Sequence, residues 1–162
     1  MNILGIDPGG ASTGYGLVRL EAGKLERIRS GEIRPPRKSA LSGRLEFVHS
    51  GVKELLRTLA VDEIAVEDLY QGVNPRTASR IGHVRGVILR AAAESGIPIF
   101  EYPPNEVKSA VVGNGLATKE QVRFMVQRIL SLSETISSSD ESDALAVAIC
   151  HCHRCGEGVP GR

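Results

Sequence analysis

The sequence predicts one α/β domain, built as a five-stranded mixed sheet with helices on both faces. Three strand-like segments joined by short turns come first, and two further short apolar runs each follow a helical pattern. The 162 residues are enough to bury a core, and fractions of 41% hydrophobic and 24% charged residues are ordinary for a globular domain. These three observations together define the fold class.

The first three predicted strands are residues 2–7, 14–20 and 24–34. The first, NILGID, is a short apolar run that ends in an Asp-Pro-Gly turn. The second and third, GYGLVRL and KLERIRSGEIR, are separated only by EAG and therefore form a hairpin. Strands joined by such short turns are expected to be mostly antiparallel.

Helices and strands then alternate along the chain. Pro35-Pro36 ends the third strand, and apolar residues recur at helical spacing from Leu45 to Leu59. EIAVED (63–68) and IPIFEY (97–102) are short buried strands reached through helices, so we expect them to lie parallel to the first strand. The other helices are expected to start at Asn74-Pro75, after Pro103-Pro104, at Thr118 with Gln121, and near Asp140.

Four carboxylates are predicted to meet at one edge of this sheet. Asp7 ends the first strand and Glu67 the fourth, and sites tend to form where the carboxyl ends of parallel strands share an edge. Asp140 and Asp143 share one face of the last helix, whose apolar run ALAVAIC must pack against the sheet. Converging acids repel one another unless a cation neutralises them, and oxygen ligands select Mg²⁺ or Mn²⁺ over zinc. Asp68 should point to the opposite face.

Each acid also has an ordinary structural explanation. The helix dipole favours acids in a first turn, and Ser138 with Glu141 could be only a capping box. Asp7 before Pro-Gly could be a turn residue, and Glu67 a surface strand end. Their agreement on one sheet edge is what favours a metal site.

The cysteine–histidine end of the last helix suggests zinc at first sight. No second ligand pair lies at zinc-finger distance, and one continuous helix cannot supply a tetrahedral site. We expect Cys150 to be a core residue and the histidines to be solvated or hydrogen-bonded helix-end residues. The candidates that we set aside as zinc ligands are His151, Cys152, His153 and Cys155.

Composition argues against several other classes of protein. The start has no basic region before its short apolar run, and no stretch is long enough to cross a bilayer. Three cysteines bunched at one end make a poor disulfide framework, so we expect a reduced, cytoplasmic protein. The net charge of +1 does not indicate nucleic-acid binding, but two local clusters could form a basic face. They are Arg34, Arg37, Lys38 and Arg44, and Arg76, Arg80, Arg85 and Arg90.

Seven segments in order resemble the RuvC family of bacterial Holliday junction resolvases. GIDPG with TGYG, VEDLY and VRGV come first, followed by FEYPPNEVKSAVVGNG, TKEQV and DESDALAVAICHCH. GIDPG alone is weak, but the ordered set is highly specific and runs from about Met1 to His153. The resemblance implies a ribonuclease-H-like fold over residues 1–154. The Gly/Pro-rich end GEGVPGR predicts a disordered tail at 155–162.

The resemblance also implies an activity: a homodimer that nicks two strands of a four-way DNA junction with Mg²⁺. Two ions per site are expected, with Mn²⁺ as a substitute, and the branch-migration proteins RuvA and RuvB are implied partners. The family's acidic tetrad matches Asp7, Glu67, Asp140 and Asp143. Its functional lysines match Lys108 and Lys119, and its junction-facing aromatic matches Tyr70. Tyr70 replaces a common phenylalanine, and Asp68 replaces a common glutamine.

Several assignments keep an alternative. Arg76 and Arg80 are expected to hold DNA phosphates but could form a solvated helix face, and either lysine could simply be solvated. A dimer seam or a core face would explain Val84, Val87 and Ile88 equally well.

Three rival functions also remain. GIDPG with TGYG resembles the first phosphate loop of actin-like and sugar-kinase ATPases, although those proteins need two such domains. A non-catalytic junction-binding module would not require four convergent acids. A ribonuclease H acting on RNA–DNA hybrids would share the chemistry but not FEYPPNEVK and TKEQV.

Overall fold

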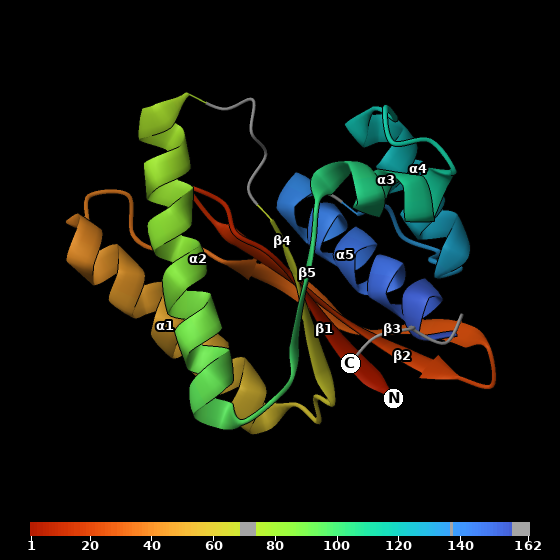
Figure 1. Ribbon diagram of the computed structural model, residues 1–162, viewed down its shortest axis with the longest axis horizontal. Helices are drawn as coiled ribbons and strands as arrows, with labels where there is room; N and C mark the ends of the chain where they lie inside the picture. Colours follow the sequence, from red (N-terminus) through yellow and green to blue (C-terminus); the bar gives the residue numbers. More distant parts are fainter. Residues whose placement is uncertain (69–73, 137, 157–162) are drawn as a thin grey trace.

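The computed structural model describes residues 1–68, 74–136 and 138–156, which form an α/β structure around one sheet (Figure 1). The strands are β1 (Asn2–Asp7), β2 (Thr13–Glu21), β3 (Lys24–Ile33), β4 (Glu63–Glu67) and β5 (Ile99–Tyr102). The helices are α1 (Leu41–Thr58), α2 (Pro75–Ser95), α3 (Pro104–Val112), α4 (Lys119–Ile129) and α5 (Ser139–Gly156).

The sheet has the predicted mixed topology. Its strand order is β3-β2-β1-β4-β5, with β1 antiparallel to β2 and parallel to β4. β3 is antiparallel to β2, and β5 is parallel to β4. The carboxyl ends of β1, β4 and β5 therefore lie at the same edge, as the short turns and helical crossovers predict.

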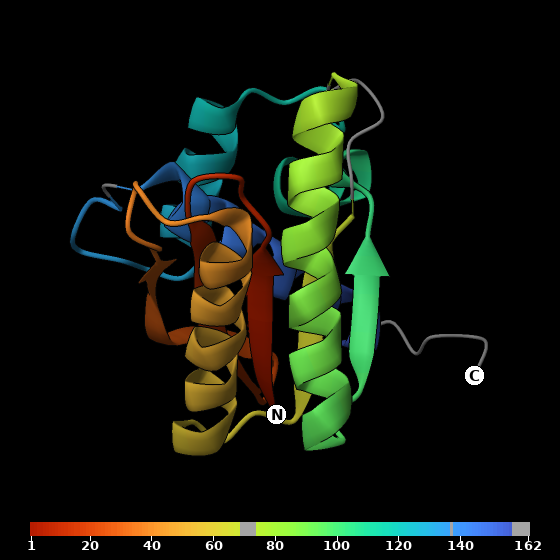
Figure 2. The same ribbon diagram turned by 90° about the vertical axis from the view of Figure 1, so that its left-hand side faces the viewer.

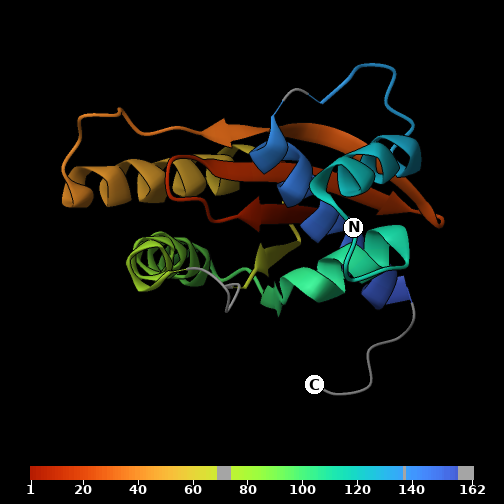
Figure 3. The same cartoon turned by 90° about the horizontal axis from the view of Figure 1, so that it is seen from above.

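Helices cover both faces of this sheet, and β1 contributes to both cores because its side chains alternate. Ile3 lies in a core with α3, α4 and α5, whereas Leu4 and Ile6 lie in a core with α1 and α2. Figure 2 shows α1 and α2 in front of the sheet, and Figure 3 shows them apart from α3 and α4. The buried Val84 and Ile88 of α2 belong to this second core, and Val87 packs against it.

α5 lies unusually close to β1 and β2 because glycines face it. A Cβ atom at Gly5 would lie 2.1 Å from the Ala144 carbonyl oxygen, and one at Gly14 would lie 1.9 Å from that of Asp140. Neither distance is sterically possible, so any larger residue at these positions would push the helix outward. Glycine at Gly5 and Gly14 thus fixes how deeply the start of α5 sits on the sheet.

The capping residues predicted from the sequence mark the first residues of the helices. The Asn74 side chain accepts a 3.0 Å hydrogen bond from the Thr77 amide, and Thr118 and Gln121 form the expected capping box. α5 begins at Ser139, one residue before the predicted start, and continues to Gly156. It thus includes two residues of the expected tail, and residues 157–162 lie outside the described residues. None of the described helices combines the length and hydrophobicity that crossing a membrane requires.

Candidate active site

The ends of β1 and β4 bring two acids together. Ile6 pairs with Val66 in the parallel ladder, so Asp7 and Glu67 follow as neighbours at the shared edge. Their carboxyl groups are close enough for Glu67 to raise the pKa of Asp7. Asp7 and Glu67 therefore lie together at the end of their strands, as the sequence predicts.

The first turn of α5 adds Asp140 and Asp143. The Ser12 hydroxyl donates a short hydrogen bond to Asp140 Oδ2, and the contact of Gly14 with the Asp140 backbone fixes the helix start. Ser138 Oγ accepts a 3.2 Å hydrogen bond from the Glu141 amide, which is one half of the capping box that the sequence left open. The Glu141 side chain turns instead to the Ser30 hydroxyl, 2.6 Å away. Capping and the placement of acids therefore coexist in this turn.

Burial and mutual repulsion perturb the two strand-end acids. Burial, followed by the nearby charges of Glu67, Asp143 and Asp140, raises the pKa of Asp7 well above its usual value. Burial and then the Asp143 carboxylate raise the pKa of Glu67 to about 7. Four acids from three elements thus affect one another electrostatically, and this edge favours bound cations.

Lys119 places a positive charge beside the four acids Asp7, Glu67, Asp140 and Asp143, which we call the acidic cluster. Its Nζ lies 2.6 Å from Asp143 Oδ2. Burial opposes the charge on Lys119, but the Asp143 hydrogen bond and the carboxylates of Asp143, Asp7 and Glu67 outweigh it and raise the pKa of the amine. Lys108, half-buried on α3, is close enough to lower the pKa of Glu67.

The other predicted residues lie around this edge or outside the described residues. Arg76 and Arg80 are exposed on α2, and Arg80 lines a shallow cavity with Arg37 and Arg44 beside the loop after β1. The Asp68 carboxylate lies 3.3 Å from Arg85 of α2, on the face away from α5, as predicted. Tyr70 lies outside the described residues.

No sequence pattern predicts the side chains that hold the acids in place. Ser12 contacts Asp140 across 128 positions, and the Ser138 hydroxyl donates a short hydrogen bond to Glu32 of β3. Small hydroxyl residues in loops are common, so neither carries a recognisable pattern. Such contacts exist only once α5 has docked on the sheet.

The cysteine–histidine end lies at the opposite end of α5, away from the acids. Cys150 and Cys152 are buried core residues, and burial raises the pKa of each thiol to about 12. His153 is exposed and hydrogen-bonded to the Ala110 carbonyl, whereas His151 is only 1% exposed and fully enclosed. The expectation of a core Cys150 is confirmed.

The acidic cluster has the donor chemistry of a hard-metal site. All four candidate ligands offer oxygen, and the two strand-end acids are half-buried with raised pKa values. A divalent cation would relieve this repulsion, and oxygen ligands suit Mg²⁺ or Mn²⁺. The residues present therefore fit the predicted metal.

This sheet order, with helices on both faces and acids at one edge, defines a ribonuclease-H-like fold with a nuclease-type acidic edge. The model of the family described as "Crossover junction endodeoxyribonuclease RuvC" matches residues 3–151. The RuvC of Syntrophomonas wolfei is 47% identical over 94% of this chain and 89% of its own length. That of Acidobacterium capsulatum is 49% identical over 94% of each chain.

Solved structures agree with this assignment. Thermus thermophilus RuvC superimposes with a TM-score of 0.87 at 32% identity, covering 98% of each chain. The same protein in complex with Holliday junction substrate gives 0.88 at 31% identity, covering 98% of this chain and 97% of that one. The chain belongs to the RuvC family of crossover junction endodeoxyribonucleases.

The protein is therefore a hydrolytic nuclease that resolves Holliday junctions, in a family of metal-dependent nucleases. The match over nearly the whole chain decides against the ATPase, the non-catalytic module and the ribonuclease acting on hybrids.

Proposed function

We propose that Asp7, Glu67, Asp140 and Asp143 hold two Mg²⁺ ions and that each site nicks one strand of a four-way DNA junction. The observation that carries this proposal is the convergence of four carboxylates from β1, β4 and α5, with raised pKa values at Asp7 and Glu67. Mn²⁺ has the same ligand preference and would substitute.

When bound, the ions would supply activation of the attacking water and stabilisation of the leaving 3′ oxygen. The charges of Glu67, Asp143 and Asp140 all act on Asp7, so its carboxylate would hold a cation together with acids from both β4 and α5. Ser12 and Gly14 orient Asp140, and Lys119 orients Asp143 through its 2.6 Å contact. Lys119 and Lys108 also place positive charge where charge builds up on the scissile phosphate.

The arms of the junction would be held largely through their phosphates. Arg80 with Arg37 and Arg44 forms a basic cavity beside the loop after β1, and Arg76 lies one turn before Arg80 on α2. Such contacts position a duplex without reading its sequence. Tyr70 is proposed to stack on an unpaired base near the crossover.

Two symmetric nicks on a two-fold substrate suit two sites related by one axis, so the proposed active form is a homodimer. Its proposed partners are RuvA and RuvB, and its proposed location is the cytoplasm. The division into a nuclease domain at 1–154 and a tail at 155–162 stays a prediction.

Cleavage of a synthetic four-way junction tests the acidic site. The parent with Mg²⁺ should produce paired symmetric nicks, and D7N should bind the junction but leave it intact. D68N is the matched control, because Asp68 adjoins the site but contacts Arg85 on the opposite face. Cutting by D7N at the parent rate, or loss of cutting in D68N as complete as in D7N, would place the catalytic acids elsewhere.

A further inference from the structure

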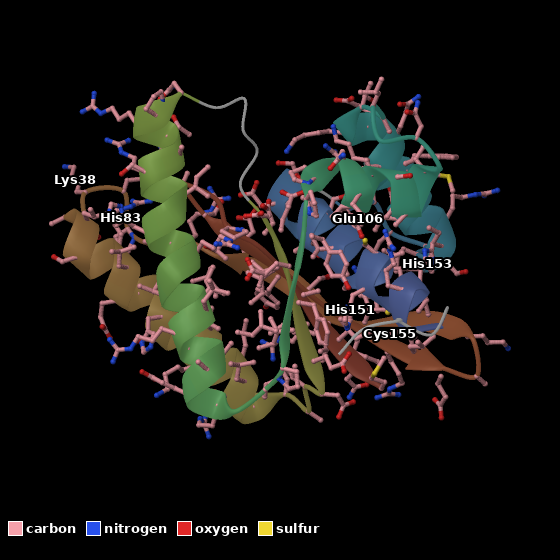
Figure 4. All side chains as sticks on the ribbon, in the orientation of Figure 1. Lys38, His83, Glu106, His151, His153 and Cys155 are labelled. Carbon is pink, nitrogen blue, oxygen red and sulfur yellow. The ribbon has the colours of Figure 1, made fainter. Side chains whose placement is uncertain are left out.

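Three donor atoms of different chemistry converge at the other end of β4 and α5. They belong to Glu63 at the start of β4 and to His151 and Cys155, one turn apart on α5. His151 Nε2 lies 2.6 Å from Glu63 Oε2 and 3.3 Å from Cys155 Sγ, and Cys155 Sγ lies 3.7 Å from Glu63 Oε2. Figure 4 shows His151 and Cys155 together near the C-terminal end of α5.

Two of these three separations are close to the edges of a tetrahedral coordination site. With zinc–ligand bonds of about 2.0–2.3 Å, neighbouring donors lie roughly 3.3–3.6 Å apart. The sulfur–nitrogen and sulfur–oxygen distances of 3.3 and 3.7 Å are already close to that range. The nitrogen–oxygen distance of 2.6 Å must open by at least about 0.7 Å, which a change of side-chain rotamer at Glu63 would supply.

We propose that Glu63, His151 and Cys155 form a second metal site, which takes Zn²⁺ with water as its fourth ligand. Thiolate, imidazole and carboxylate are the three zinc ligands of proteins, and the thiolate and imidazole disfavour Mg²⁺. The site is thus chemically distinct from the all-oxygen cluster at Asp7. It is also independent of the proposed function.

The surroundings of His151 hold its ring ready for a metal. The Tyr102 hydroxyl lies 2.6 Å from Nδ1, and the Phe100 ring lies 4.5 Å from the imidazole centroid to centroid. With Nε2 on the metal, Nδ1–H would donate to the Tyr102 oxygen, which is the usual outer contact of a ligating histidine. His151 is therefore oriented by partners that do not compete for the ligating nitrogen.

The alternative to a metal site is that Glu63, His151 and Cys155 only form hydrogen bonds with one another. A single Nε2–H bonded to Glu63 would satisfy that pair, and Tyr102 would satisfy Nδ1. In that arrangement the Cys155 thiol donates a long, 3.7 Å hydrogen bond to Glu63 Oε2, and its sulfur also lies 3.3 Å from His151 Nε2. One cation would satisfy all three donors at once, with release of the thiol proton.

Metal content of the full-length protein tests the site. Protein stripped with a chelator is incubated with Zn²⁺ in excess Mg²⁺, which occupies the acidic cluster, then passed over a desalting column and analysed by mass spectrometry. The parent should retain about one Zn²⁺ per chain. E63Q and C155S should bind at least tenfold more weakly, since each removes one of three protein ligands.

Two controls locate the metal. H153Q removes a neighbouring exposed histidine and D7N alters the acidic cluster, so both should retain Zn²⁺ like the parent. A parent that retains no Zn²⁺, retention unchanged in C155S, or loss in D7N would each overturn the proposal. D7N with lost cleavage but intact Zn²⁺ retention would leave the two sites separate, as proposed.

Cobalt substitution keeps the test decisive if a variant fails to fold. Co²⁺ in the parent should give a thiolate-to-cobalt charge-transfer absorption, and folded C155S should not. Absence of that absorption in Co²⁺-loaded parent would exclude Cys155 as a ligand.

Discussion

The two ends of the β4–α5 pair carry two clusters of opposite character. The four steps from Glu63 to Glu67 span about 13 Å of strand, and the eight steps from Asp143 to His151 span about 12 Å of helix. Because these lengths nearly match, one packing arrangement brings strand and helix side chains together at both ends. One cluster contains only acids, and the other combines carboxylate, imidazole and thiol.

The two clusters differ in whether their side chains can hydrogen-bond to one another or mainly repel one another. Glu63, His151 and Cys155 lie within 4.8 Å of one another and share hydrogen bonds, whereas the four acids form no such tight group. Burial first, and then repulsion from the neighbouring acids, raises the pKa values of Asp7 and Glu67. We therefore expect a bound cation to stabilise the cluster of four acids more than the cluster of Glu63, His151 and Cys155, whose side chains already share hydrogen bonds.

Removing one acid should give the largest effect. E67Q keeps the shape of the side chain but removes the charge of one of the two strand-end acids. We expect junction cleavage to fall by about 10²–10³-fold, the scale seen when one charge-stabilising group is lost. E63Q, the matched change at the other end of β4, should cleave within a few-fold of the parent. Equal losses in the two variants, measured in single-turnover assays, would contradict the division of roles.

The pH dependence of stability should differ between metal-free and Mg²⁺-bound protein. The pKa of Glu67 is raised to about 7, so the folded state holds a proton that the unfolded state releases from about pH 4.5 upward. Stability of the metal-free protein should fall as pH rises through this window, by an amount on the order of 3 kcal/mol. Denaturant unfolding at pH 5 and 8 checks this.

Mg²⁺ should offset this loss, with a larger rise in Tm at pH 8 than at pH 5. The variant E67Q should flatten the metal-free profile. A profile that is the same in E67Q and parent would show that another group is responsible.

Enlarging Gly14 should disturb the acidic end through packing alone. The added methyl of G14A would meet the Asp140 carbonyl oxygen at 1.9 Å, so the start of α5 must move. We expect a stability loss of about 1–3 kcal/mol, the range for overpacking, with reduced cleavage. G86A, on the exposed side of α2 where a Cβ has open space, is the control and should change stability little. Thermal unfolding of the two variants side by side makes the comparison.

Loss of the Ser12 hydroxyl should give the smallest effect. S12A removes the hydrogen bond to Asp140 Oδ2 and leaves every acid in place. A bond of this kind contributes about 0.5–1.5 kcal/mol, so cleavage should fall by roughly 2–12-fold. A raised Mg²⁺ requirement in the cleavage assay would locate the defect in metal binding. Unchanged cleavage and metal dependence would show that Ser12 does not position Asp140.

Sequence reasoning found the acidic end because its signals are local. Asp7 and Glu67 each end an apolar strand, and the spacing of Asp140 and Asp143 fixes their common helix face. Two general rules, that parallel strands end at one edge and that an apolar helix packs on a sheet, complete the site. Tyr70 stays a prediction.

The cluster of Glu63, His151 and Cys155 could not be predicted from the sequence in the same way. The histidines and cysteines of one helix cannot form a tetrahedral site by themselves, and Glu63 begins β4, at the end of the strand away from the acids. Which end of α5 reaches the start of β4 depends on the angle and depth at which the helix crosses the sheet. Glycines such as Gly5 and Gly14 set that depth, and no periodicity in the sequence reports it.

The central claim is that acids distant in sequence meet and bind divalent ions. Anomalous diffraction from crystals of the protein soaked in Mn²⁺ measures this directly. We predict Mn²⁺ density in contact with Asp7 and at least one of Glu67, Asp140 and Asp143. Density absent from that edge, or confined to Glu63, His151 and Cys155, would contradict it.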